Sequence, residues 1–155
     1  DVNAVNYNSV LLTNDFQLDN ESILKQMDQN TKLIFICSPN NPTGNLIKKE
    51  DIRNLLVQLK NVIVVIDEAY IDFSGAESWL REVNNFKNLI VIQTLSKAYG
   101  MAGLRLGICY AQTEIIDVLK KIKMPYNVNV LSQRKAITEL EKEGKFQQEL
   151  KEILT

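Results

Sequence analysis

Lys97 lies in a stretch whose composition suits chemistry carried out by an amine. The stretch runs Thr-Leu-Ser-Lys-Ala-Tyr-Gly-Met-Ala-Gly-Leu-Arg from Thr94 to Arg105, directly after the apolar run 89–92. A lysine at the end of a buried segment is either costly to desolvate or chemically used, and a neutral amine is both a nucleophile toward carbonyl carbon and a base. The stretch therefore marks Lys97 as a candidate catalytic residue.

Two further polar clusters follow apolar runs in the same way. Asn40-Asn41-Pro42-Thr43-Gly44 follows the run 33–37, and Asp67-Glu68-Ala69-Tyr70 follows the run 62–66. If the runs are parallel strands of one sheet, their carboxyl ends meet at one edge, where α/β proteins bind ligands. The three clusters are then expected to converge on one crevice.

Each cluster also has a plain structural interpretation. Asn-Pro-Thr-Gly favours a turn in any protein, because proline fixes φ and glycine permits a positive φ. Asp67-Glu68 could cap a helix or hold a metal. Lys97 alone could be solvated, and Arg105 alone could form a surface ion pair. The nucleotide-binding alternatives lack support, because the chain has neither a Walker-type loop nor a Gly-x-Gly-x-x-Gly fingerprint. The combination is far more specific than any part.

The spacing of the apolar runs predicts the fold class. The runs begin at Leu33, Val62 and Leu89, and helical periodicity lies between them, as βαβ units require. Runs that are apolar throughout fit strands covered on both faces. We therefore predict an α/β fold, a three-layer α/β/α arrangement around a mostly parallel, doubly wound sheet. Further strands are expected at 8–13 and 104–110, and helices at 19–27, 48–60, 78–83, 113–123 and, interrupted near Gly144, 128–154.

Composition excludes several classes of function. The chain has 155 residues, a net charge of −1 and no histidine, which argues against nucleic-acid binding, a zinc site and a Ser-His-Asp triad, and no metal is expected. No apolar run reaches the ~20 residues of a membrane span. Cys37 and Cys109 both lie in apolar runs and are expected to be reduced core thiols of a cytoplasmic protein.

A pyridoxal phosphate site needs this set of residue types. Its aldehyde is held by a lysine, its ring nitrogen stays protonated beside a carboxylate, and its phenolic oxygen accepts from groups such as tyrosine and asparagine. Its phosphate needs hydroxyls, backbone N–H groups and a guanidinium. Asn41, Asp67, Tyr70, Lys97 and Arg105 would supply these groups from one crevice.

The same motifs also resemble a known family. Ser-Pro-Asn-Asn-Pro-Thr-Gly, Asp-Glu-Ala-Tyr and the long lysine motif look like those of the fold type I aminotransferases, most of all the histidinol-phosphate aminotransferase branch of class II, to which 125–129 is also similar. The resemblance runs from about 31 to 133. It implies that Lys97 is the Schiff-base lysine and that Asp67 pairs with the pyridine nitrogen. It further implies that Tyr70 and Asn41 bind the phenolic oxygen, and that Thr94, Ser96 and Arg105 hold the phosphate.

The resemblance implies an activity as well. Lys97, once displaced by an amino donor, would act as the base of a transamination, with histidinol phosphate and 2-oxoglutarate as substrates, in histidine biosynthesis. Two alternatives stay open. The chain could belong to a related decarboxylase of an amino-acid phosphate, since the residues that choose the bond to break lie largely outside it. It could also be a non-catalytic α/β module that binds another anion.

The family comparison also predicts how the chain is organised. Residues 1–123 are expected to be the central part of the pyridoxal-phosphate-binding large domain, and 124–155 a hinge and helical segment leading to an absent small domain. The chain begins in mid-pattern without methionine, so we expect a fragment that is inactive alone. The full-length protein is expected to be a homodimer with shared active sites.

Overall fold

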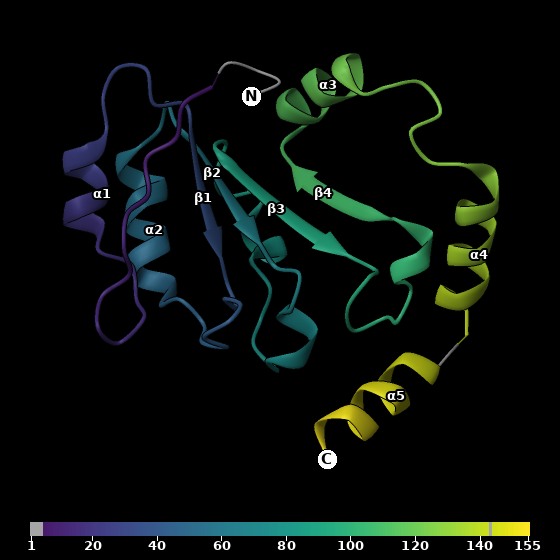
Figure 1. Ribbon diagram of the computed structural model, residues 1–155. Helices are drawn as coiled ribbons and strands as arrows, with labels where there is room; N and C mark the ends of the chain where they lie inside the picture. The colour runs from purple at the N-terminus through teal and green to yellow at the C-terminus, as the bar shows by residue number, and fades with distance from the viewer. Residues whose placement is uncertain (1–4, 143) are drawn as a thin grey trace.

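A four-stranded sheet forms the centre of the computed structural model, which describes residues 5–142 and 144–155 (Figure 1). The strands stand in the order β1-β2-β3-β4, with β1, β2 and β3 parallel and β4 antiparallel to β3. The elements in chain order are α1 (Asn20–Gln26), β1 (Leu33–Cys37), α2 (Lys49–Gln58), β2 (Ile63–Asp67), η1 (Ile71–Phe73), η2 (Trp79–Glu82), β3 (Leu89–Thr94), η3 (Ala102–Leu104), β4 (Gly107–Ala111), α3 (Thr113–Ile122), α4 (Val130–Leu140) and α5 (Lys145–Leu154). The predicted mostly parallel sheet is confirmed.

The β1–α2–β2 unit shows why the sequence adopts this arrangement. In α2, Ile52, Leu55 and Leu56 recur at helical spacing and are almost fully buried against the sheet. Burying side chains of this size contributes about 1.5–3 kcal/mol each before the entropy cost of ordering them. Upstream, the Asp19 carboxylate caps α1 by accepting from the backbone N–H of Ser22 at 2.9 Å. Figure 1 shows α1 and α2 together on the β1 side of the molecule.

The two faces of the sheet differ in how they are covered. One face presents alternate residues, among them Ile36, Ile66 and Val91, to a core completed by α1, α2 and Trp79. On the other face Leu33 and Phe35 are exposed, Phe35 to 68%. This second face is open along β1, whereas Val65 and Ile90 on the two central strands are buried, and it carries the side chains at alternating positions such as 67, 92 and 94.

The cysteines do not lie in the core, so that prediction was wrong. Cys37 ends β1 and Cys109 lies within β4, and both are exposed. Side chains alternate along a strand, so an apolar run can still point every second residue toward an open face. Both thiols nevertheless remain partly desolvated, which raises the pKa of each, and the nearby Asp67 charge adds to the effect at Cys37.

Several predicted elements differ in type or extent. Residues 8–13 are not a strand, and the helix expected at 78–83 is the short 3-10 segment η2. The last strand begins at Gly107 rather than Leu104 and runs back along β3, because the connection after Thr94 contains no crossover helix. The expected break of the C-terminal helix is confirmed, since α4 ends at Leu140 and α5 starts after Gly144. Among the described residues, none of the helices combines the length and apolarity needed to cross a bilayer.

Candidate active site

Asn41, Tyr70 and Lys97 meet beyond the carboxyl ends of β1, β2 and β3. The Asn41 amide donates a hydrogen bond to the Tyr70 hydroxyl at 3.2 Å. The Lys97 ammonium lies over the Tyr70 ring, 5.1 Å from its centre. Three segments far apart in the sequence thus supply one amide, one phenol and one amine to a common point, which is the convergence predicted from the strand ends.

Asp67 is the last residue of β2 and starts the turn that carries Tyr70. Its Oδ1 accepts a hydrogen bond from the backbone N–H of Ala69 at 2.9 Å, which fixes the carboxylate and tightens the turn. Asp67, Ala69 and Thr94 line a hollow of about 420 Å³ on the open face of the sheet. The carboxylate thus closes an Asx-type turn, which is not the helix cap considered for Asp67, and the turn uses only one carboxylate oxygen.

The lysine loop is closed by hydrogen bonds between its two ends. The backbone N–H of Leu95 donates to Leu106 O at 3.2 Å, and the Thr94 hydroxyl donates to the same carbonyl at 3.2 Å. The Thr94 hydroxyl also accepts from the backbone N–H of Ser96 at 3.1 Å. Gly100 adopts a positive φ of 63°, where a side chain would be strained, and its N–H donates to Lys97 O. This loop holds Lys97 between β3 and β4.

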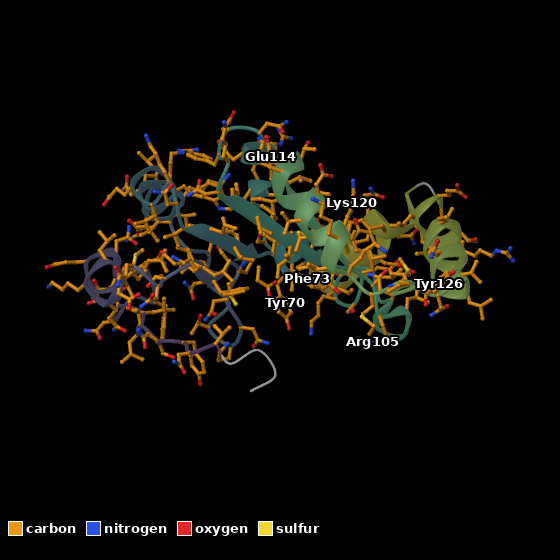
Figure 2. The ribbon with its side chains drawn as sticks, turned by 90° about the horizontal axis from the view of Figure 1, so that it is seen from above. Tyr70, Phe73, Arg105, Glu114, Lys120 and Tyr126 are labelled. Carbon is orange, nitrogen blue, oxygen red and sulfur yellow. The ribbon has the colours of Figure 1, made fainter. Side chains whose placement is uncertain are left out.

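Arg105 lies at the far end of that loop. It is exposed, adopts a left-handed backbone with φ 54°, and its guanidinium donates to Ala102 O at 3.1 Å. Figure 2 shows Tyr70 and Phe73 close together, with Arg105 farther along toward the helices of the C-terminal part. Thr94 pairs with Gly107, two residues after Arg105, and among the described residues Arg105 makes no hydrogen bond to the other predicted site residues.

The Lys97 amine and the Asp67 carboxylate have no ion-pair partner within the described part of the chain. Lys97 forms neither an ion pair nor a hydrogen bond there, and Oδ2 of Asp67 accepts no hydrogen bond. An amine and a carboxylate left without counter-charges suit a ligand that brings an electrophilic carbon and a protonated nitrogen. The residue types therefore fit pyridoxal phosphate, for which Lys97 would hold the aldehyde and Asp67 would face the ring nitrogen.

A second hollow, of about 330 Å³, adjoins Tyr70, which does not line the first hollow. It is lined by the Asn-Pro loop and by the aromatic turn, namely Pro39, Asn40, Asn41, Pro42, Gly44, Tyr70, Phe73 and Ser74. Tyr70 and Phe73 approach to 6.4 Å between ring centres. The sequence analysis did not identify Phe73 as part of the site. The one signal in the sequence was its spacing of three residues from Tyr70.

Glu68 is a buried residue whose role the sequence did not reveal. Its side chain is 1% exposed and accepts from Ser78 Oγ at 2.5 Å, from the backbone N–H of Trp79 at 2.7 Å and from Gln93 Nε2 at 2.9 Å. Burying a carboxylate costs several kcal/mol, so three hydrogen bonds are the minimum expected compensation. The predicted options for Asp67-Glu68, a helix cap or a metal ligand, do not describe Glu68.

Comparison with known proteins agrees with this geometry. The family model for aminotransferase class I and II matches residues 2–155. A curated protein of Flavobacterium johnsoniae named histidinol-phosphate aminotransferase is 56% identical over 153 residues, covering 99% of this chain and 44% of that protein. The chain thus spans less than half the length of the curated relatives it matches.

Solved structures give the same result. The histidinol-phosphate aminotransferase of Clostridium acetobutylicum superposes with a TM-score of 0.80 and 30% identity, over 90% of this chain and 43% of that chain. The L-threonine-O-3-phosphate decarboxylase of Porphyromonas gingivalis superposes with a TM-score of 0.62 and 30% identity, over 70% of this chain and 34% of that chain. These matches confirm the α/β fold class, and with the family model they show that the chain belongs to the class I and II aminotransferases.

Proposed function

We propose that the protein carrying this chain is a pyridoxal-phosphate-dependent histidinol-phosphate aminotransferase acting in histidine biosynthesis. The observation that carries the proposal is the meeting of Asn41, Tyr70 and Lys97 at one point. The names of the most similar relatives support the substrate assignment. The reaction would convert histidinol phosphate and 2-oxoglutarate to imidazole-acetol phosphate and glutamate.

Each site residue has a role that follows from its chemistry. Pyridoxal phosphate, when bound, supplies an aldehyde for amines and a protonated ring that withdraws electrons from the substrate carbon. Asp67 would keep the ring nitrogen protonated, while Asn41 and Tyr70 would bind the phenolic oxygen. Thr94, Ser96 and Arg105 would hold the phosphate. Lys97 Nζ would hold the aldehyde and, once released, move the proton of the substrate α-carbon.

The organisation of the full-length protein is part of the proposal. Residues 1–123 would form the central part of the cofactor-binding domain, and 124–155 would lead through α4 and α5 to a further domain. The full-length protein would be a cytoplasmic homodimer with shared active sites. Sedimentation of the full-length protein tests the dimer, and a monomer at working concentration would contradict it.

Covalent labelling tests the cofactor assignment. The full-length protein is incubated with pyridoxal phosphate, reduced with borohydride and digested, and the modified peptide is identified by mass spectrometry. We expect the label on Lys97 and none in Lys97→Ala, with Lys123→Ala as a labelled control. A label on a different lysine, or full turnover by Lys97→Ala, contradicts the proposal.

Product analysis tests the reaction type. With histidinol phosphate and 2-oxoglutarate we expect glutamate in equal amount to the keto product. The similarity to a decarboxylase structure makes carbon dioxide release the specific competing outcome. Carbon dioxide from an amino-acid phosphate without glutamate would replace the aminotransferase assignment by the decarboxylase.

A further inference from the structure

We propose that Glu68 is a positioning residue for the cofactor site, tying together the strand ends that carry Asp67 and Thr94. The inference rests on the proposed function, because it assumes that a ligand spans these two residues. It assigns a role to a buried carboxylate that takes no direct part in the proposed reaction.

The alternation of side chains along β2 and β3 carries the inference. Asp67 pairs with Ile92 in the sheet, so Glu68 comes opposite Gln93 one step later. Asp67 and Thr94 line the hollow on the open face. The side chains of Glu68 and Gln93 instead bind each other at 2.9 Å next to Ser78. Glu68 is thus bonded next to Asp67 on β2, and Gln93, which also lines the hollow, is bonded next to Thr94 on β3.

The bond is anchored to the covered side of the sheet. Oε1 of Glu68 accepts from the backbone N–H of Trp79, which is 3% exposed, and Oε2 accepts from Ser78 Oγ. The backbone N–H of Glu68 also donates to Ile92 O at 2.9 Å. Glu68, itself part of the Asp67–Tyr70 turn, therefore joins three segments: the ends of β2 and β3 and the start of η2.

We call the hydrogen bonds of Glu68 to Gln93, Ser78 and Trp79 the brace. A brace of this kind matters when the ligand is rigid. Pyridoxal phosphate has a fixed distance between its ring nitrogen and its phosphate, so the Asp67 carboxylate and the Thr94 hydroxyl must keep a matching separation. Productive sites are held to within about 0.5 Å by the residues behind them. Without the Glu68–Gln93 bond, the two strand ends lose the side-chain link closest to both ligand-facing residues.

The brace also depends on the number of acceptors that Glu68 provides. A carboxylate accepts only, which matches donors on Ser78, Trp79 and Gln93. Glu68→Gln keeps the shape but turns one acceptor into an amide N–H₂ group. That group either faces the N–H₂ of Gln93 or leaves the N–H of Trp79 without its acceptor. With the Gln93 amide in its present orientation, one buried donor is then left unpaired in this variant.

Exchange of the two side chains gives the sharpest test. Glu68→Gln is expected to raise the dissociation constant for pyridoxal phosphate about tenfold in the full-length protein, because a buried hydrogen bond between the two strand ends is lost. The double variant Glu68→Gln/Gln93→Glu restores an amide–carboxylate pair in the reverse direction and is expected to recover most of the affinity. Gln93→Ala, which leaves the other two bonds intact, serves if Glu68→Gln does not fold.

A second buried hydrogen-bonding residue supplies the control. The Asn88 amide donates to Leu56 O, Leu59 O and Val62 O near the start of β3, away from the proposed site. Asn88→Ala should lower the melting temperature without changing the affinity for pyridoxal phosphate. Affinity is measured by absorbance titration of the apo protein, and melting by circular dichroism.

The outcomes separate the two proposals. If the wild type binds pyridoxal phosphate at Lys97 but Glu68→Gln and Gln93→Ala bind it equally well, the positioning role is overturned and the proposed function stands. The same holds if these variants lose only melting temperature, as Asn88→Ala does. If the wild type does not bind pyridoxal phosphate at Lys97, both proposals fall. Weakened binding rescued by the exchange supports the brace.

Discussion

The side-chain amide of Asn41 donates a hydrogen bond to the hydroxyl of Tyr70 at 3.2 Å, although 29 residues separate them in the chain. The bond joins the loop after β1 to the turn after β2, and it is exposed. An exposed hydrogen bond of this kind adds only about 0.5–1.5 kcal/mol to stability. Its value is therefore in arranging two donors at one point before a ligand arrives.

Removal of the Tyr70 hydroxyl should affect turnover more than stability. Tyr70→Phe keeps the ring under Lys97 but removes one donor to the cofactor oxygen. We expect kcat of the full-length enzyme to fall roughly ten- to hundredfold. Removing one hydrogen-bond donor to a developing negative charge typically lowers kcat by about 10²- to 10³-fold. Steady-state kinetics measures the effect, and Tyr126→Phe, at a side chain that is 96% exposed, is the matched control. Unchanged kcat in Tyr70→Phe would argue against its role.

Neutralising Asp67 should separate binding from catalysis. Asp67→Asn retains an oxygen that can accept from the Ala69 N–H, so the turn should survive. The charge beside the ring nitrogen is lost, and we expect kcat to fall by about 10²-fold or more while borohydride labelling of Lys97 persists. Kinetics and peptide mapping on the same sample test this. Loss of labelling together with turnover would mean that Asp67 acts mainly in folding or binding.

Arg105 should distinguish ligands with and without a phosphate. Arg105→Lys keeps the positive charge and the backbone strain of a left-handed residue, but it loses the two-pronged contact of a guanidinium. Binding of pyridoxal phosphate should weaken about tenfold, whereas binding of pyridoxal should not change. Arg81→Lys, at an exposed ion pair with Glu77, is the control. Equal effects on both ligands would show that Arg105 does not bind the phosphate.

The junction of α4 and α5 should weaken in acid. The Lys135, Lys142 and Lys145 ammonium groups surround Glu139 and hold the pKa of its carboxyl well below the ordinary value of 4.5. A carboxyl with a lowered pKa stabilises the fold above its unfolded value and loses that effect as pH falls toward its folded value.

Glu139→Gln should therefore lower the melting temperature at pH 7, and the difference from wild type should shrink progressively below pH about 4.5. Salt at about 1 M should reduce the difference too. The control is Glu21→Gln, which removes one exposed pair with Lys25. A difference that is constant between pH 7 and pH 3 would show that the charge of Glu139 is not what holds the junction.

Much of the site could be predicted from residue types and their order. Apolar runs of strand length each ended in a polar cluster, and parallel strands must bring such clusters to one edge. Asn41, Tyr70 and Lys97 do meet there. The roles assigned to these residues and to Asp67, Thr94, Ser96 and Arg105 remain predictions, which the labelling and the variants above test.

The sequence by itself determined the three parallel strands, the helix between the first two and the chemistry of the polar clusters, because these depend on local periodicity and on residue type. Only the tertiary structure decided the direction of β4, the exposure of Cys37 and Cys109, and the partners of Glu68. Each of these depends on which face a side chain meets across the sheet, and that is set by pairing between distant segments. An apolar run does not carry that information, since the same residues can face a packed layer or an open one.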